Sequence, residues 1–406
     1  MPLRVETSIP YGNACDIEVV ERGTTSDVRF AADPHGGPEC LWFCFRLAAE
    51  GPPPAARPPR RTEVPPADEP RSGGPPAADR VRLVLKHPDG MLGVGRGENL
   101  RAVVRSPQAD WRRLPAPSVE ALPDGRHRIA WDVPAPAPWL DVALCYPYGM
   151  PDVQRLVEET GGYWRADPIG VSQGGRPIVR LSNGPGEAGG QRPGLYLVAR
   201  QHSGETPGSW VLDGLLRRLA ERGDRAPLVW AVPLSNMDGI EQGDYGKDNF
   251  PYDLNRAWGH PPQAQPMRHE TMVIQRDADR WKERCRPVLG LDFHAPGGNE
   301  AAGAYVFGPD REAQPERHRA AARWFDAMAG ALGDLAAKDF VRVARYASRW
   351  ATPGFREFFE SLGVCGLCLE TPYAMVGERV LAREDYREMG RRLADGLAGE
   401  AFAAAP

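Results

Sequence analysis

Two residues that could hold a metal ion stand three positions apart in the stretch VARQHSGETPGSWVL, residues 198–212. His202 offers an imidazole nitrogen and Glu205 a carboxylate oxygen, and zinc accepts both kinds of ligand. A structural alternative exists, because a glutamate near a helix N-terminus is favoured by the helix dipole and a histidine can fill a turn. The pair alone therefore leaves both interpretations open.

Two more residues of the same kind end apolar runs further along the chain. His294 ends the run LGLDFH, and Glu370 ends the run CGLCLE. An apolar strand that ends in a carboxylate is costly to bury unless the carboxylate is paired or used in chemistry. Together with the first pair, these residues favour a catalytic metal site with three protein ligands and one position for water.

A polar stretch, residues 235–258, lies between the first pair and His294. We expect a long loop here, and loops of this length in a compact α/β domain are usually functional. Near its end, Asn255 and Arg256 place an amide and a guanidinium side by side. The planar guanidinium can hold a carboxylate through two hydrogen bonds, although a surface ion pair is the simpler interpretation.

The elements that must position these residues can be inferred from the alternation of apolar and helical stretches after residue 150. Four apolar runs alternate with amphipathic helical segments. The runs are GLYLVA, PLVWAVPL, VLGLDFHA and VCGLCLE. This alternation predicts an α/β domain over residues 151–406, with a mixed, mainly parallel sheet covered by helices on both faces. Chemistry in such sheets usually occurs at the carboxyl ends of the strands, where the candidate residues stand.

Residues 1–150 show a different pattern of short apolar runs bounded by turn residues. These runs indicate antiparallel strands, so we predict an N-terminal β-sandwich domain. They are CDIEVV, ECLWFCFRLA, RVRLVLKH, HRIAWDV and WLDVALCY. The proline-rich stretch 51–78 interrupts this domain. Its composition cannot form a core, and we expect an extended surface insertion.

The composition of the 406-residue chain excludes several classes of function. A net charge of −4 and a pI of about 6.1 give no basic footprint for nucleic acid or an anionic membrane. Neither a signal peptide nor a membrane span is predicted, so we expect a cytoplasmic protein whose oligomeric state the sequence leaves open. Seven cysteines do not suggest a disulfide framework, and Cys365 and Cys368 are interpreted as thiols on a buried strand.

Five motifs, taken in chain order, resemble those of the zinc carboxypeptidases of the carboxypeptidase A type. They are HSGE, NMDG, DLNR, DFHA and LETPY. IGVSQGGRPI is similar to the segment that precedes the first zinc motif in that family. Three segments in the first half of the chain resemble the N-terminal β-domain of the cytosolic carboxypeptidase branch and its junction with the catalytic domain. They are YGNACDIEV, CLWFCFRLA and CYPYGMPDVQRL. The resemblance covers nearly the whole chain apart from the proline-rich insertion.

The resemblance implies roles for the candidate residues in a zinc metallocarboxypeptidase. Glu370 would be the general base, and Asn255 and Arg256 would hold the C-terminal carboxylate of a peptide or protein substrate. The enzyme would then release C-terminal residues, with acidic residues as one candidate preference. One Zn²⁺ ion would be held by His202, Glu205 and His294, with water as the fourth ligand.

The chain departs from the family pattern at three places. An arginine that stabilises the oxyanion usually precedes DLNR, and here only Lys247 could replace it, as a point charge. Deglutamylating members carry a basic residue before the catalytic glutamate, where this chain has Gly354. Arg349 and Arg356 flank this position and are candidate substitutes, so a preference for glutamate stays open. The mobile active-site tyrosine of the family has three candidates here, Tyr305, Tyr346 and Tyr373.

Two other functions remain open on the sequence. A related zinc amidohydrolase that deacylates N-acyl amino acids would use the same metal ligands and the same carboxylate clamp. It would prefer a short acyl amino acid and reject extended peptides. A non-catalytic peptide-binding protein is the other alternative, and it predicts that the change Glu370→Gln has no measurable effect.

Overall fold

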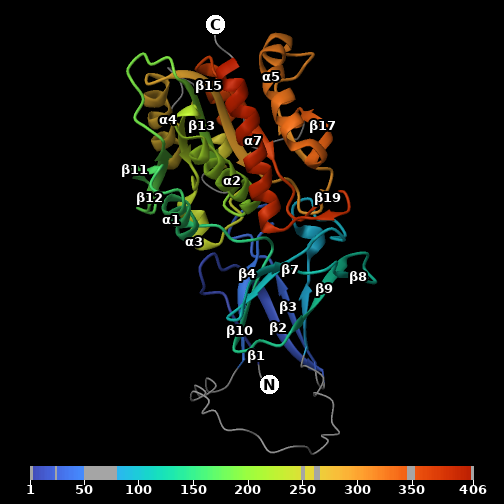
Figure 1. The fold of residues 1–406 in the computed structure, drawn as a ribbon. Helices are drawn as coiled ribbons and strands as arrows, with labels where there is room; N and C mark the ends of the chain where they lie inside the picture. Colours follow the sequence, from blue (N-terminus) through green and yellow to red (C-terminus); the bar gives the residue numbers. More distant parts are fainter. Residues whose placement is uncertain are drawn as a thin grey trace, which may run out of the picture.

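The structure of the protein is a computed structural model that describes residues 3–22, 25–49, 80–247, 252–259, 266–344 and 353–403. The proline-rich insertion predicted at residues 51–78 lies outside the described residues. Figure 1 shows two small sheets of the N-terminal region beneath a larger α/β part.

The N-terminal region consists of two five-stranded sheets. The first has the order β1 (Leu3–Glu6), β4 (Cys44–Ala49), β10 (Trp139–Ala143), β6 (Val103–Ser106), β7 (Ala109–Arg113). The second has the order β2 (Cys15–Arg22), β3 (Thr25–Ala31), β5 (Arg80–Leu85), β9 (His127–Pro134), β8 (Ser118–Ala121). The sheets share one core, in which the rings of Phe30 and Phe45 lie 4.7 Å apart.

One strand pair in this region differs from the predicted antiparallel pattern. β3 and β5 pair in parallel, with Thr25 opposite Arg80 and Phe30 opposite Leu85. The strand between them in sequence, β4, belongs to the other sheet. The chain therefore crosses to the first sheet and returns before β5 forms, which a pattern of short apolar runs does not reveal.

The larger part contains the predicted mixed, mainly parallel sheet. The central strands β14 (Leu228–Val232), β13 (Pro193–Ala199), β15 (Arg286–His294) and β18 (Cys365–Glu370) are neighbours in that order and run parallel. Antiparallel pairing joins β12 to β14 on one side and β16 to β18 on the other. The outer strands are β11 (Arg165–Val171), β12 (Pro177–Ser182), β16 (Ala304–Phe307) and β17 (Ala336–Arg342).

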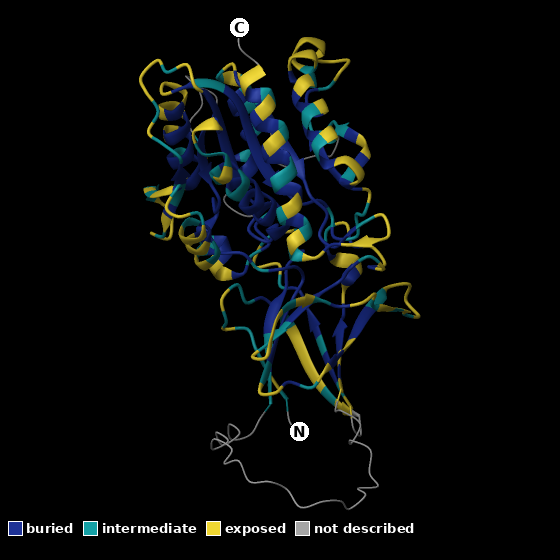
Figure 2. Ribbon diagram, viewed as in Figure 1, coloured by how far each residue is buried: buried dark blue, intermediate teal, exposed yellow. Residues whose placement is uncertain are grey.

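Helices cover both faces of this sheet (Figures 1 and 2). Along β13, Leu195 and Leu197 join the apolar cluster that includes α2, α5 and α7, while Tyr196 and Val198 join the cluster that includes α4 and α6. This alternation follows from the two-residue period of a strand. The helices are α1 (Met150–Glu159), α2 (Thr206–Arg222), α3 (Met237–Gln242), α4 (His269–Lys282), α5 (Pro315–Leu332), α6 (Phe355–Ser361) and α7 (Arg383–Ala403).

The remaining described elements are short. Four 3-10 helices are η1 (Pro88–Gly90), η2 (Gly223–Arg225), η3 (Leu254–Arg256) and η4 (Gly333–Leu335), and a small hairpin is formed by β19 (Met375–Val376) and β20 (Arg379–Val380). The largest buried cluster contains residues of the N-terminal sheets as well as residues of the larger part. The domain boundary expected at residue 150 remains a prediction.

The long loop expected at residues 235–258 is only partly a loop. It begins with the helix α3, because the side chain of Asn236 accepts a hydrogen bond from the Gly239 amide and so caps the helix N-terminus. Gly243, with φ of 73°, ends the helix in the left-handed conformation that glycine tolerates. The expectation of one continuous loop was therefore wrong, since a six-residue helix leaves little hydrophobic period in the sequence.

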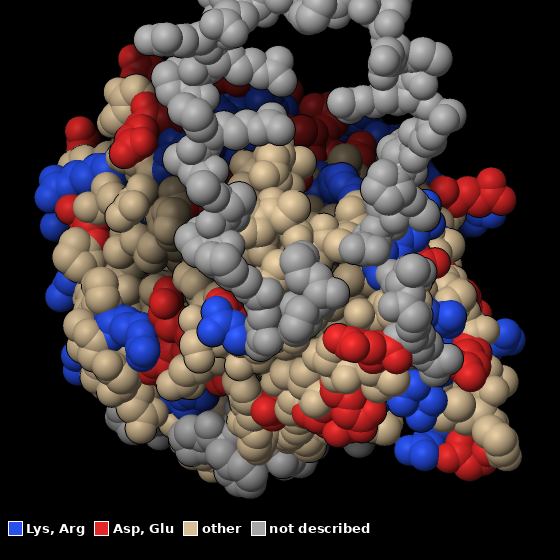
Figure 3. Space-filling view, turned by 90° about the horizontal axis from the view of Figure 1, so that it is seen from below, with Lys and Arg blue, Asp and Glu red and all other residues tan. Residues whose placement is uncertain are grey.

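The surface shows both signs of charge. On the face in Figure 3, basic and acidic side chains are interspersed with uncharged ones. Elsewhere in the described structure many charged side chains form ion pairs, such as those of Lys86 with Asp16 and Glu18 at 2.9 and 3.0 Å. Among the described residues, no helix is long and apolar enough to cross a membrane.

Helices α2 and α7 approach each other so closely that their backbones touch. A Cβ atom added to Gly390 of α7 would lie 1.9 Å from the carbonyl oxygen of Val211 in α2. One added to Gly214 of α2 would lie 2.0 Å from the carbonyl oxygen of Arg387 in α7. Neither atom can move away without shifting a helix, so the packing depends on these two glycines.

We predict that the change Gly390→Ala lowers the free energy of unfolding by about 3 kcal/mol, because it overpacks this contact. Gly399→Ala on the same helix is the matched control, since nothing lies within 4 Å of its Cβ position. That change should raise the free energy by up to ~1 kcal/mol through helix propensity. Equal effects of the two changes in urea unfolding would contradict the described helix contact.

Candidate metal centre and active site

The candidate residues meet at the carboxyl ends of three neighbouring strands. His202 stands in the turn after β13, and Glu205 is the residue that precedes α2. His294 and Glu370 are the last residues of β15 and β18, where they are register partners. The parallel order β13-β15-β18 therefore brings together side chains that are far apart in the sequence.

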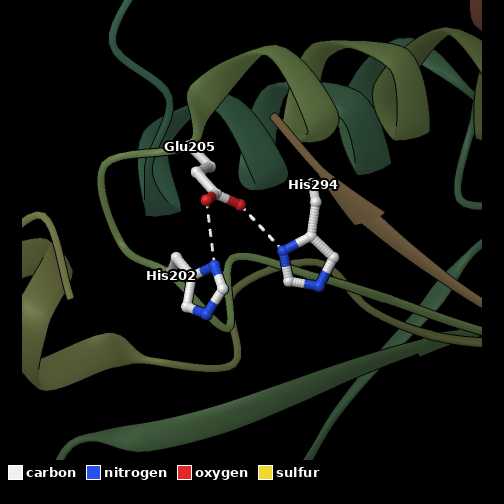
Figure 4. Close-up of side chains that lie close together, drawn as sticks. All are labelled: His202, Glu205 and His294. Carbon is white, nitrogen blue, oxygen red and sulfur yellow. Dashed lines mark hydrogen bonds and ion pairs between the residues drawn. The ribbon is translucent and has the colours of Figure 1, made fainter. Parts of the chain in front are cut away.

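The carboxylate of Glu205 lies between the two imidazoles (Figure 4). Its Oε1 is 2.9 Å from Nδ1 of His202, and its Oε2 is 2.8 Å from Nδ1 of His294. The hydroxyl of Tyr245 donates to Oε1 at 3.2 Å, and the amide of Ala295 donates to Oε2 at 3.2 Å. These contacts hold the carboxylate in one orientation, with both imidazoles turned toward it.

The donor atoms of the three residues fit a divalent metal ion. One ligand atom each from His202, Glu205 and His294 can be chosen so that all lie within 4.8 Å of one another. Two imidazole nitrogens and one carboxylate oxygen are a common ligand set of catalytic zinc sites. The three side chains are buried, so an ion would meet them in a preformed arrangement.

A second carboxylate stands behind each imidazole. Nε2 of His202 is 3.1 Å from Oδ1 of Asp253, and Nε2 of His294 contacts Oδ2 of Asp292. Such partners favour the tautomer with the proton on Nε2, which leaves the Nδ1 lone pair for a metal. We did not predict these two aspartates from the sequence, although they stand within the motifs DLNR and DFHA.

The carboxylates make the site attractive to a cation. Burial opposes a charge on His202, but Glu205 and Asp253 raise its pKa to about 9. Burial also opposes the charge on Glu205, yet the two imidazoles hold the pKa of Glu205 well below its usual value. Protons on the imidazoles thus balance the buried negative charge here, and a divalent ion could take their place.

The turn that carries His202 and Glu205 depends on a buried arginine. Arg200 adopts the left-handed conformation, with φ of 64°. Its guanidinium donates to the carbonyl oxygens of Ser203 at 2.7 Å and of Tyr148 at 2.8 Å. Burial lowers the pKa of Arg200 to about 10, so it remains charged at neutral pH. These bonds fix the turn that carries both candidate ligands.

A cavity of about 1050 Å³ opens onto this centre. It is large enough for a peptide end or a small acylated amino acid. The candidate metal ligands, the candidate base and the candidate substrate-binding residues all line it: His202, Glu205, Lys247, Asn255, Arg256, His294 and Glu370.

Glu370 has the properties of a proton acceptor. It is 9 % exposed, and its Oε2 has no hydrogen-bond partner in the described structure. Burial raises the pKa of Glu370 to about 7, although His294 opposes the rise. A carboxylate with such a pKa can gain and lose a proton near neutral pH.

Asn255 and Arg256 lie on the short helix η3 at another wall of the cavity. The amide of Asn255 donates to Oδ1 of Asp253 at 2.7 Å, which caps this helix. Oδ1 of Asn255 accepts from the amide of Phe355 at 2.9 Å, and Nη1 of Arg256 donates to the carbonyl oxygen of Asn255 at 2.7 Å. Asp253 therefore positions both a candidate metal ligand and the candidate substrate clamp.

The structure explains why Gly354 replaces the basic residue expected there. A Cβ atom at this position would lie 2.5 Å from the carbonyl oxygen of Asn255, so no side chain fits. Arg356 also lines the cavity, but its guanidinium donates to Glu357 at 2.8 Å and to the carbonyl oxygen of Gly308 at 2.9 Å. It is part of the wall rather than a substitute for the missing side chain.

The other candidates from the sequence have different outcomes. Lys247 lines the cavity, with its Nζ 3.8 Å from Oε2 of Glu39 in the N-terminal region. Tyr305 also lines the cavity. Tyr373 is fully buried, and its hydroxyl donates to the Gly204 carbonyl at 3.4 Å, so it does not face the cavity. Tyr346 and Arg349, the other flanking candidate for the basic residue, lie outside the described residues.

The N-terminal region forms one wall of the cavity. Leu92 and Gly93 line it, and their carbonyl oxygens accept from the amides of Gly298 and Asn299, each at 3.0 Å. The amide of Asn99 donates to Oδ1 of Asn299 at 2.7 Å. The loop that follows His294 is therefore held by a segment that precedes it by some 200 residues.

We predict that Zn²⁺ raises the melting temperature of the chain and that Glu205→Gln removes most of this rise, because the amide cannot replace the charged ligand. An ion at 1,000 times its Kd stabilises the folded state by about 4 kcal/mol. Glu158→Gln, a change of an exposed residue on α1, is the control and should keep the full shift. A full shift that survives Glu205→Gln in thermal unfolding would contradict the proposed ligand set.

Comparisons with known proteins agree with this arrangement. Residues 191–372, less than half of the chain, match the family described as succinylglutamate desuccinylase/aspartoacylase catalytic domain. The matched range runs from the start of β13 to just beyond β18 and contains every candidate residue that lines the cavity.

Sequence relatives include cytosolic carboxypeptidases. Cytosolic carboxypeptidase 6 of Caenorhabditis elegans is 26% identical over 207 residues, which is 46% of this chain and 45% of that protein. The Mus musculus protein of the same name is 29% identical over 206 residues, which is 45% of this chain and 37% of that protein. The matches therefore span less than half the length of these relatives.

Solved structures share the fold over the whole chain. A metallo-carboxypeptidase from Burkholderia cenocepacia has a TM-score of 0.73 and 18% identity, with both chains covered completely. A metallo-carboxypeptidase from Pseudomonas aeruginosa, in complex with (2-guanidinoethylmercapto)succinic acid, has a TM-score of 0.66 and 19% identity, with 98% of each chain covered. At these identities the likeness establishes the fold.

Proposed function

We propose that this zinc carboxypeptidase-like chain is a metal-dependent carboxypeptidase, which hydrolyses the last peptide bond of a peptide or protein. The observation that carries the proposal is the convergence of His202, Glu205 and His294 within 4.8 Å at a cavity that also holds the buried base Glu370. The similarity to cytosolic carboxypeptidases supports the same reaction.

The metal in this proposal is a single zinc ion held by His202, Glu205 and His294. Mixed nitrogen and oxygen ligands suit zinc, and the cavity leaves one side of the ligand set open. When bound, zinc would polarise the carbonyl of the substrate and lower the pKa of a water molecule. Asp253 and Asp292 keep the two imidazoles oriented for this ion.

Glu370 performs the proton transfers of the proposed reaction. Its carboxylate takes a proton from water as the water oxygen bonds to the carbonyl carbon. It then passes that proton to the leaving nitrogen as the carbon–nitrogen bond breaks, so the amine leaves in neutral form. The ammonium group of Lys247 stabilises the negative charge that develops on the carbonyl oxygen.

Asn255 and Arg256 restrict the reaction to chain ends. The guanidinium and the amide hold the terminal carboxylate of the substrate, which places the last peptide bond beside Glu370. A preference for acidic C-terminal residues has no support at Gly354 or at Arg356. Gly354 has no side chain to bind an acidic group, and Arg356 is already paired with Glu357.

A second candidate function is the deacylation of short N-acyl amino acids. The match of residues 191–372 to the desuccinylase/aspartoacylase family favours it. The same metal ligands and the same base would cleave the amide bond, and Arg256 would hold the carboxylate of the amino acid. The two functions differ in the length of the substrate on the acyl side of the cleaved bond.

We predict that the purified chain releases single C-terminal residues from a library of peptides and that a metal chelator abolishes the release. Peptides with a C-terminal amide should resist cleavage, because they lack the carboxylate that Arg256 holds. Mass spectrometry of the products tests both points. Cleavage of N-acyl amino acids with no cleavage of longer peptides would favour the deacylase, and internal cleavage would exclude both functions.

We predict that Glu370→Gln lowers kcat by about 10²- to 10⁴-fold, because the amide cannot accept the proton from water. The stabilisation by Zn²⁺ should persist in this variant. Glu357→Gln is the matched control, since Glu357 lines the same cavity but has no role in the proton transfers. An unchanged kcat in Glu370→Gln would instead support a non-catalytic peptide-binding protein.

A further inference from the structure

A second group of ligand atoms lies on the other side of the His294 imidazole. Asp292, His294 and Cys368 each offer one ligand atom, and these atoms lie within 4.8 Å of one another. All three residues are buried. We propose that they form a second cation site, distinct from the first centre and specific for thiophilic divalent ions such as Cd²⁺ and Zn²⁺.

The sheet places these three side chains on one face. Asp292 and His294 are two residues apart on β15, so their side chains point the same way. Cys368 of β18 is the register partner of Asp292. Its Sγ lies 4.0 Å from Oδ2 of Asp292, the oxygen that also contacts Nε2 of His294. Nitrogen, oxygen and sulfur donors thus gather around one point between two adjacent strands.

Asp292 has unsatisfied capacity to bind a cation. The residue is fully buried at 0 % exposure, and its Oδ1 has no hydrogen-bond partner in the described structure. Its Oδ2 accepts from the side-chain amide of Gln201 and contacts His294. A buried carboxylate oxygen without a partner is costly, so the Asp292 carboxylate as a whole favours an added positive charge nearby.

An ion can reach the site without unfolding of the protein. His294 and Cys368 both line the cavity of about 1050 Å³ that leads to the first centre. The second site therefore shares its entrance with the substrate and with the first ion, and Asp292 closes it from behind.

The donor set determines which ions fit. Thiolate, imidazole and carboxylate ligands suit zinc and cadmium, whereas Mg²⁺ and Ca²⁺ require oxygen ligands. Burial raises the pKa of the Cys368 thiol, so the sulfur is protonated at neutral pH and a poor target for oxidants. A thiophilic cation forms its bond to sulfur as the thiol proton leaves to the solvent.

His294 links the two sites. Its Nδ1 faces Glu205 in the first centre, and its Nε2 faces Asp292 in the second. An ion in the second site takes the place of the Nε2 proton, and the imidazole then serves two cations at once. If the proposed carboxypeptidase function holds, an excess of a thiophilic cation slows the hydrolysis through this shared imidazole.

Cys365 provides a matched control. It stands three residues before Cys368 on the same strand, and the odd spacing points its side chain to the opposite face of the sheet. It does not line the cavity, and it is half-buried. The change Cys365→Ser therefore removes a thiol from β18 without touching the proposed site.

Titration of the full chain with Cd²⁺ tests the proposal through the ultraviolet charge-transfer band of the thiolate–cadmium bond. The band should appear in the wild type and in Cys365→Ser and be lost in Cys368→Ser. Persistence of the whole band in Cys368→Ser, or its absence from the wild type, would overturn the second site. This readout does not depend on hydrolysis, so it separates this proposal from the proposed function.

A measurement on the wild type covers the case in which Cys368→Ser does not fold. The ¹¹³Cd NMR spectrum of the cadmium-loaded chain should show two resonances. One would be at the position typical of nitrogen and oxygen ligands, from the first centre, and one shifted toward sulfur ligation. Nitrogen- and oxygen-type resonances alone would overturn the proposal.

Discussion

The rest of the site depends on the contacts of the Glu205 carboxylate with two imidazoles. Each of its oxygens contacts one imidazole, and each imidazole is backed by a further carboxylate. This arrangement concentrates negative charge in a buried place, which is stable only if protons or a cation balance it. The proposed base, Glu370, adds another buried carboxyl group at the same strand ends. A metal-dependent reaction is the simplest chemistry that uses this excess of negative charge.

The fold supplies this arrangement through parallel neighbours and close backbone contacts. The carboxyl ends of the parallel strands β13, β15 and β18 lie side by side at the same end of the sheet. The buried Arg200 fixes the turn after β13. The N-terminal region contributes as well, because Leu92 and Gly93 hold the loop after His294 and line the cavity. The two parts of the chain therefore build the site jointly, and the role of the N-terminal sheets extends to the cavity wall.

Much of the architecture could be predicted from the sequence, because apolar runs that end in His or Glu mark the carboxyl ends of strands. The mixed, mainly parallel sheet and the resemblance to zinc carboxypeptidases were both confirmed. Asp253 and Asp292 could not be assigned, since an aspartate beside a motif has many possible partners until the strands are paired. In the sequence, Gly354 stands where the family resemblance predicts a basic residue. The structure shows that the close approach of the Asn255 carbonyl requires a glycine there. The parallel pairing of β3 with β5 and the short helix α3 depend on tertiary contacts that apolar periodicity does not encode. The roles of the individual site residues and the domain boundary at residue 150 stay predictions.

X-ray absorption at the zinc edge of the zinc-loaded chain tests the central claim most directly, because it reports the atoms bound to the ion. For the chain loaded with one zinc ion per molecule, the account predicts two imidazole nitrogens at about 2.0–2.1 Å and light-atom oxygen ligands at about 2.0–2.2 Å, with the histidine signal reduced by half in His294→Ala. A spectrum without imidazole ligands, or one that His294→Ala leaves unchanged, would contradict it.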